Sequence, residues 1–240
     1  MNGRVQFSAP KLTQTNKIVL ILAVVGFVLQ ALFTAVGAFS LSRFLGLSSS
    51  GLSQGLVYQI ITYPFVDSQF MGVLFNGLVL WFIGSDLEAS WGEKVYRRFL
   101  LINVIVVGLI YALISFMFFF GTPVHYAPLV GLTGLNYALL MSYALIYPER
   151  EMLLMMIFPV KAKYFCMILA AIEFYFALSS NGISSWAHIL AMGVAFILVK
   201  YQTQPMVRKL INPSSSPRVK KSKAKLSIVK DDQKPPKYWQ

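Results

Sequence analysis

The sequence predicts an all-α membrane protein, a bundle of six membrane-spanning helices. Of its 240 residues, 57% are hydrophobic and 12% are charged, about half the charged share of a soluble domain. Residues 18–41 and 99–148 contain no Lys, Arg, Asp or Glu, and residues 164–199 contain a single acid, Glu173. A helix that crosses a bilayer needs about 20 apolar residues, so these stretches are long enough for several crossings.

The basic residues predict how the crossings are oriented. The expected crossings are residues 18–41, 68–85, 98–119, 131–148, 163–179 and 184–200. With six crossings, every Lys and Arg except Arg43 falls on the same side of the membrane. Because Lys and Arg are enriched in cytoplasmic loops, both termini are predicted to be cytoplasmic.

The chain is divided into three parts by this assignment. Residues 1–17 are expected to be a cytoplasmic tail, residues 18–204 the six-helix membrane domain, and residues 205–240 a basic, disordered cytoplasmic tail. The first external loop, about 42–67, is long and apolar enough to lie in the membrane interface.

The net charge of +12 is concentrated in the last part of the chain, since ten of the 21 Lys and Arg residues follow residue 204. A basic tail beside a membrane helix is typical of contact with anionic lipid, and we expect no nucleic-acid partner. The single cysteine, Cys166, excludes an internal disulfide and a CxxC metal site. No metal and no cofactor are expected.

Three polar residues lie inside expected crossings, where polar groups are costly and therefore informative. Measured from the cytoplasmic ends of their helices, Asn76, Thr133 and His188 lie roughly 15, 24 and 18 Å deep. In a hydrocarbon core about 30 Å thick, all three are at or above the midplane on the external side. We therefore expect them to share one cavity that water can reach.

Small residues predict that the fourth and sixth crossings pack closely. Gly134, Ala138 and Ser142 recur every four residues on one crossing, and His188, Ala191 and Ala195 share a face of the other. A hydroxyl beside a histidine is the minimal activated nucleophile. The N–H groups at the start of the fourth helix, around Thr133, would offer donors to an oxyanion. The alternative is that Thr133 and His188 only satisfy each other's hydrogen bonds.

Several short motifs occur in an order that resembles the rhomboid family of intramembrane serine proteases. The sequence contains Asn76 in the second crossing, a G-x-x-x-E-x-x-x-G run at Gly84, Glu88 and Gly92, GLTG at 131–134 followed by Tyr137, and AHILA at 187–191. The resemblance covers about residues 18–200. It implies a six-helix bundle with a short central fourth helix, and substrates that come in sideways beside the second and fifth helices.

The resemblance also implies site roles. His188 would be the general base, Thr133 would stand at the serine nucleophile position, and Asn76 with Gly131 would stabilise the oxyanion. Tyr137, Gly134, Ala191 and Glu88 would support the site, Tyr137 by packing on His188 and Glu88 as a structural acid; the alternative for Glu88 is an ordinary loop acid.

Two departures from the family pattern concern the reaction itself. The methyl group of Thr133 restricts χ1 and crowds the attacking oxygen. The family often has a His one turn before the oxyanion Asn, and this position is Gly72 here.

Two function classes therefore stay open. The first is a rhomboid-type protein that recognises transmembrane segments and has a Thr–His version of the endopeptidase dyad, with weak or lost cleavage of membrane-spanning substrates. The second is a pseudoprotease that acts as a binding or quality-control module. The partners expected are transmembrane substrates or clients, and the expected location is a bacterial inner membrane.

Overall fold

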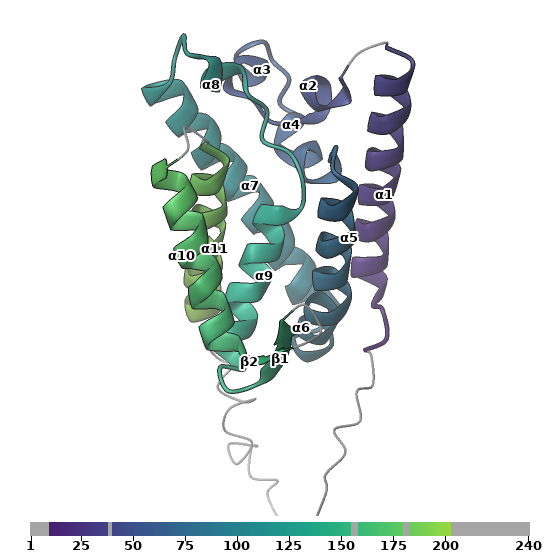
Figure 1. The fold of residues 1–240 in the computed structure, drawn as a ribbon, viewed down its shortest axis with the longest axis vertical. Helices are drawn as coiled ribbons and strands as arrows, with labels where there is room; N and C mark the ends of the chain where they lie inside the picture. The colour runs from purple at the N-terminus through teal and green to yellow at the C-terminus, as the bar shows by residue number, and fades with distance from the viewer. Residues whose placement is uncertain (1–9, 38–39, 155–157, 180–182, 203–240) are drawn as a thin grey trace, which may run out of the picture.

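Apolar helices form the bundle in the computed structural model, which describes residues 10–37, 40–154, 158–179 and 183–202 (Figure 1). Five helical segments in these residues are long and apolar enough to cross a membrane. They are α1 (Gln14–Ala35), the continuous α5–α6 segment (Phe70–Trp91), α7 (Glu93–Phe118), α10 (Ala162–Ser179) and α11 (Ile183–Gln202). The sixth expected crossing is α9 (Thr133–Ile146), a shorter apolar helix in the middle of the bundle. The predicted all-α membrane class is confirmed, and the predicted tail at 205–240 lies outside the described residues.

The first crossing was expected at residues 18–41, whereas the helix spans Gln14–Ala35. The helix ends at Ala35 because Gly37 follows with φ 69°, a conformation that a glycine adopts without steric cost. At its other end the helix starts at Gln14, within the segment expected to be a tail. Thr15 and Asn16 are buried there and find polar partners on α6, so a helix start beyond the apolar run is stable.

The second crossing is one continuous helix with a widened turn. It consists of α5 (Phe70–Val79), a π-helical turn η2 (Leu80–Gly84) and α6 (Ser85–Trp91). It therefore runs six residues past the expected end at 85, and Gly92, with φ 83°, ends it. Charged residues in α6 are accommodated because they have partners on other elements, as described below.

The segment between α1 and α5, predicted to be external and called the external segment below, folds into short helices: α2 (Leu41–Leu45), α3 (Ser49–Ser53), α4 (Gln59–Thr62) and the 3₁₀ turn η1 (Tyr63–Phe65). The buried Gln59 fastens them, since its Nε2 donates to the carbonyls of Arg43 and Phe44 at 3.3 and 3.1 Å. The Tyr63 hydroxyl donates to the Val104 carbonyl of α7 at 3.3 Å. This last hydrogen bond attaches the segment to α7.

The connection from α9 to α10 forms a hairpin that the sequence did not predict. β1 (Glu151–Leu154) and β2 (Phe158–Lys161) pair antiparallel, with Glu151 opposite Lys161. Strands of four residues are too short for an alternating pattern to stand out from the apolar helices on either side. Before the hairpin, Arg150 Nη1 donates to Asp86 Oδ2 of α6 at 2.6 Å, which joins the inner ends of two crossings.

Helices α9 and α11 are packed closely at the centre of the bundle. Ala138 and Ser142 of α9, and Ala187, Ala191 and Ala195 of α11, are each at most 1% exposed. A Cβ at Gly134 would lie 3.6 Å from His188 Cδ2 and 3.9 Å from Ala191 Cβ, so the glycine lets the imidazole approach the α9 backbone. The close packing of the fourth and sixth crossings expected from these small residues is confirmed.

Candidate functional site

Thr133 is the first residue of α9 and its hydroxyl is held by α5. The preceding turn contains Gly131 with φ 89°, a left-handed conformation that favours glycine. From the neighbouring helix, Asn76 Nδ2 donates to Thr133 Oγ1 at 3.3 Å. The structure thus brings together two of the three polar residues singled out in the sequence.

Asn136 is a site residue that the sequence reasoning missed. It lies one turn below Thr133, 3% exposed, and its Nδ2 donates to Asn76 Oδ1 at 2.8 Å and to the Asn76 carbonyl at 3.1 Å. These two bonds fix the Asn76 amide so that its own Nδ2 faces Thr133. Asn136 is three residues after Thr133 in an apolar run, and this spacing could have revealed it.

His188 of α11 is in contact with aromatic and acidic side chains. The Tyr137 ring lies 5.3 Å from the imidazole at 34°, as the resemblance led us to expect. Glu173 Oε2 of α10 lies 3.2 Å from His188 Nδ1. This is an ion-pair distance, although the two groups are not aligned as a hydrogen bond. Glu173 is buried and faces protein.

Thr133 and His188 lie on adjacent packed helices, but no hydrogen bond joins them in the described part of the chain. The Thr133 oxygen accepts from Asn76, while the imidazole Nδ1 faces Glu173. The geometry therefore does not contain the hydrogen-bonded pair of a resting dyad.

Gly131 does not have a free N–H for an oxyanion. Its N–H donates to the Tyr63 carbonyl at 3.0 Å, because the η1 turn of the external segment lies directly against this loop. The oxyanion role expected for Gly131 therefore conflicts with its backbone hydrogen bond. The partner is 68 residues away in the sequence, so no local pattern could have predicted it.

A carboxylate occupies the space beside the two glycines at the outer end of the site. A Cβ added at Gly72 or Gly131 would lie 3.1 or 3.3 Å from Asp67 Oδ2. Asp67 is half-buried and accepts from the Gln69 N–H at 3.0 Å. Where the sequence analysis found only a missing His at Gly72, the structure places an acid.

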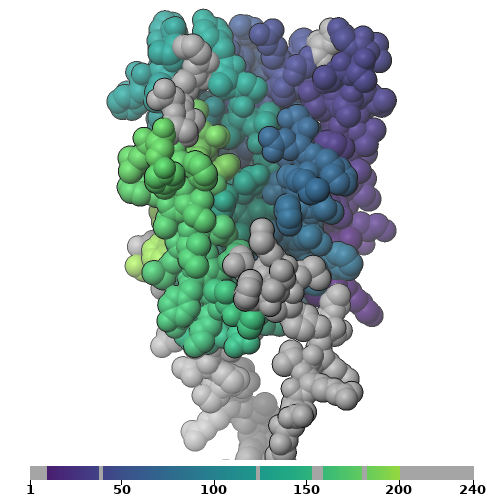
Figure 2. Space-filling view, in the orientation of Figure 1, coloured from purple at the N-terminus to yellow at the C-terminus, as the bar shows by residue number. Residues whose placement is uncertain are grey.

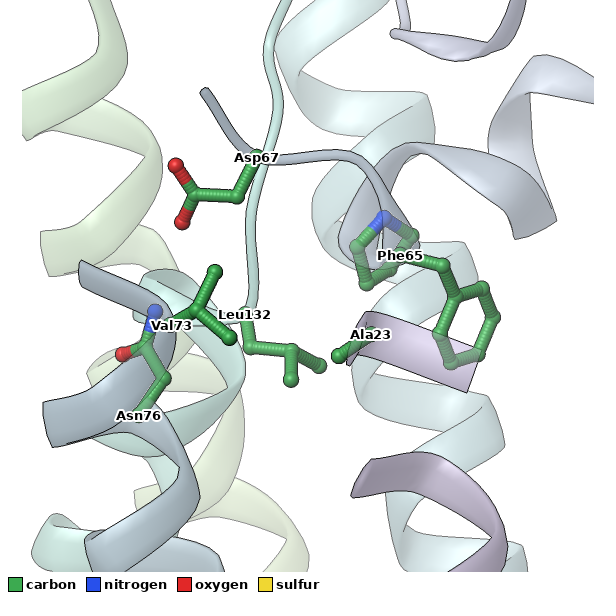
Figure 3. A pocket seen from close by; sticks show the side chains of 7 residues that line it. Ala23, Phe65, Asp67, Val73, Asn76 and Leu132 are labelled. Atoms are coloured by element: carbon green, nitrogen blue, oxygen red, sulfur yellow. The ribbon is translucent and has the colours of Figure 1, made fainter. Parts of the chain in front are cut away.

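A small pocket lies beside this acid, between α1, η1, α5 and the start of α9. Asp67, Asn76 and Leu132 line it together with four apolar residues, Ala23, Pro64, Phe65 and Val73. In Figure 3 the carboxylate points away from Ala23 and Phe65, toward the side on which Val73 and Asn76 lie. The polar groups therefore gather on one wall of the pocket.

Glu88 joins α6 to the start of α1 and is only 5% exposed. It accepts from Thr15 Oγ1 at 2.5 Å, from Asn16 Nδ2 at 3.3 Å and from the Thr13 hydroxyl. Asn16 in turn accepts from the Tyr96 hydroxyl at 2.7 Å. The contacts agree with a structural acid and exclude an ordinary loop acid.

Among the described residues, no group of three His, Cys, Asp or Glu side chains is placed to hold a metal ion. Cys166 is buried on α10, with its Sγ 3.6 Å from Met141 Sδ. It packs as a small apolar residue.

Comparison with known proteins relates the chain to eukaryotic membrane proteins. The profile of a family described as "Eukaryotic integral membrane protein (DUF1751)" matches residues 17–215. Rhomboid-like protein 19 of Arabidopsis thaliana is 27% identical over 129 residues, which are 51% of this chain. The chain spans 41% of the length of this relative.

These findings correct the expected location. The matching family is eukaryotic, so the prediction of a bacterial inner membrane is wrong, whereas an integral multi-pass membrane protein is supported. The distribution of Lys and Arg indicates which side of a membrane a loop lies on, and it contains nothing that separates one organism from another.

Proposed function

Since the chain belongs to the DUF1751 family of eukaryotic integral membrane proteins, we propose that it binds membrane-spanning segments of other proteins without cutting them. One observation carries the proposal: the two groups named above as oxyanion donors, the Gly131 N–H and the Asn76 amide, already donate to oxygens within the protein. Gly131 donates to the Tyr63 carbonyl, and Asn76 donates to the Thr133 hydroxyl.

An N–H group that already donates to a protein oxygen cannot stabilise an oxyanion, and this makes hydrolysis slow. Removing one oxyanion donor typically lowers the rate by a factor of about 10²–10³, and here two donors are directed at protein oxygens. The Asp67 carboxylate lies beside Gly131 and would repel the negative charge of a tetrahedral intermediate. These effects act on the same reacting atoms, and the methyl of Thr133 adds crowding to them.

The surface offers a place for a bound helix. Figure 2 shows α9 at the bottom of a furrow between α10 and α5. The two flanking helices expose apolar side chains, among them Met71, Leu74 and Phe75 on α5 and Met167, Ile168 and Ile172 on α10. A transmembrane helix in the furrow would pack against these side chains, and its polar atoms would reach the polar site at the outer end of α9. This position corresponds to the sideways access implied by the rhomboid resemblance.

A second candidate, a threonine endopeptidase, is favoured by the position of Glu173. An acid at Nδ1 of a histidine is the third group of a hydrolytic triad, because it holds the tautomer whose Nε2 is free to act as a base. Glu173 Oε2 lies 3.2 Å from His188 Nδ1, and the Cδ2 side of the ring is against the start of α9.

The two candidates are separated by one experiment on the full-length chain in liposomes. A single-spanning test protein with a photo-crosslinking residue in its transmembrane helix is incubated with the wild type, Thr133→Ser and Thr133→Ala. We expect crosslinks on α5 and α10 and no cleavage by any variant, because Gly131 and Asn76 would still be engaged in the serine variant. Cleavage by Thr133→Ser that Thr133→Ala lacks would instead establish the endopeptidase. Crosslinks only on α1 and α7 would refute binding in the furrow.

A further inference from the structure

We propose that Asp67 forms a cation-binding site at the outer end of the furrow, which pairs with a Lys or Arg side chain near the external end of a bound helix. Asp67 would thereby select which transmembrane segments bind. This selection rests on the proposed function, which supplies the helix in the furrow, whereas the cation site is argued from the charge and the hydrogen bonds around Asp67.

Asp67 lies beside both α5, which flanks the furrow, and the start of α9, which forms its bottom. Its Oδ2 would be 3.1 Å from a Cβ at Gly72 on α5 and 3.3 Å from a Cβ at Gly131, in the turn before α9. The same Gly131 Cβ would be 3.9 Å from Thr133 Oγ1, so the carboxylate and the hydroxyl are close neighbours. In Figure 3 the carboxylate is directed away from Ala23, on the apolar side of the pocket. A helix in the furrow would therefore have its outer end beside Asp67.

The polar site offers acceptors rather than donors. Within the described residues Asp67 accepts one hydrogen bond, from the Gln69 N–H at 3.0 Å, whereas an ionised carboxylate has about four acceptor sites. Deeper in the site, Asn136 Oδ1 is buried and has no hydrogen-bond partner in the part of the chain that the structure describes. The Gly131 N–H and Asn76 Nδ2 already donate to protein oxygens. A ligand that fits this site is therefore a hydrogen-bond donor.

The charge of the site favours a donor that is also a cation. Residues 10–37, 40–154, 158–179 and 183–202 supply no ion pair to Asp67. Every Lys and Arg except Arg43 is predicted to be on the cytoplasmic side, so the protein itself brings little positive charge to this end. A charge beside the hydrocarbon core is stabilised by a charge of opposite sign.

A client helix can supply this cation. The side chains of Lys and Arg have long apolar stems, so their charged ends reach the membrane interface from a position within the helix. The apolar side chains of α5 and α10 would pack on many helices alike, so the carboxylate supplies the selectivity.

Charge-selective labelling of a thiol tests the cation site without a client. In the full-length Cys166→Ala protein in liposomes, Thr133→Cys places a thiol near the carboxylate. The thiol is modified with a cationic or an anionic methanethiosulfonate reagent of similar size. The test variant is Asp67→Asn, which keeps an oxygen for the Gln69 N–H, and the matched control is Glu93→Gln, an exposed acid on α7.

We expect the ratio of the cationic to the anionic labelling rate to fall about tenfold in Asp67→Asn, because a nearby charge attracts one reagent and repels the other. The ratio should stay unchanged in the control. An unchanged ratio in Asp67→Asn, an equal fall in the control, or a thiol that neither reagent modifies would overturn the cation site.

Crosslinking of a client tests the selection. The single-spanning test protein carries Lys, Gln or Glu at one position in the outermost turn of its helix and a photo-crosslinking residue in the inner half. With the wild type, we expect the Lys form to crosslink to α5 and α10 about tenfold more than the Gln form, and the Glu form least. Asp67→Asn should remove this preference, and Asp67→Lys should reverse it, so that the Glu form crosslinks best.

The outcomes separate the selection from the proposed function. If labelling and crosslinking both depend on Asp67 as described, both proposals are supported. If all three forms crosslink equally well to α5 and α10, or the preference survives in Asp67→Asn, the selection fails and the proposed function stands. If the labelling ratio depends on Asp67 and no form crosslinks, the proposed function fails and the cation site stands.

Discussion

Replacing Glu88 by Ala should destabilise the bundle strongly, because this acid joins α6 to the start of α1. Three donors lose their common acceptor, namely the Thr13 and Thr15 hydroxyls and Asn16 Nδ2. A buried donor left without a partner costs about 1–3 kcal/mol, and hydroxyls can rotate to new partners. We therefore expect a loss of about 3–5 kcal/mol, as for other broken buried charged networks.

Thermal unfolding in detergent measures this loss. For a chain of this size, 1 kcal/mol shifts the midpoint by about 2–4 °C, so Glu88→Ala should lower it by about 6–20 °C. The matched control is Glu93→Ala, since Glu93 is exposed and, within the described ranges, its one ion pair is with Arg97 at 3.5 Å. An exposed pair contributes about 0–1 kcal/mol, so this control should stay within a few degrees of the wild type. A Glu88→Ala midpoint as close to the wild type as that of the control would refute the reasoning.

Three further predictions concern other parts of the chain. Gly84→Ala should lower stability by about 1–3 kcal/mol in the same unfolding assay, because its Cβ would lie 2.6 Å from the Tyr96 hydroxyl; an unchanged midpoint would mean that the tyrosine moves freely. Glu149 accepts from Lys161 and Lys163, which lower its pKa to about 2. Since this pKa is lowered on folding, the stabilisation by these two contacts is present above the ordinary pKa of about 4.5 and is lost as the pH falls toward 2; carboxyl NMR should show Glu149 still ionised at pH 4.5, and a midpoint at 4.5 would contradict the contacts. Reporter fusions should place both termini in the cytoplasm, and a terminus reachable from outside would contradict the assignment of crossings.

The helices could be predicted from the sequence because their signals are local. Apolar runs and the distribution of Lys and Arg indicate the six crossings, and the small residues Gly134 and Ala191 indicate which two pack most closely. The ends of the helices were predicted less accurately. A polar residue such as Asn16 can lie within a helix when a residue distant in the sequence accepts its hydrogen bond.

The chemistry of the site could be predicted only in part. Residue types and depth identified Asn76, Thr133 and His188, yet their partners depend on folding. The Gly131 N–H is engaged by a carbonyl from the external segment, and His188 faces an acid on α10. Which hydrogen bond a polar group makes is decided by tertiary contacts that one sequence does not display.

The widened turn at η2 determines which way the inner end of the second crossing faces. An α-helix rotates by about 100° per residue, so one residue absorbed in a π turn offsets everything after it by about that angle. Glu88 lies just beyond this offset and points at α1, while Asp86 reaches Arg150. Deleting a single residue between Leu80 and Gly84 would remove the absorbed residue and return the helix to regular geometry, so both acids would still face their partners. The turn therefore accommodates one residue more than a regular helix would, and a single deletion here should be tolerated better than a single deletion in the regular turns of α5.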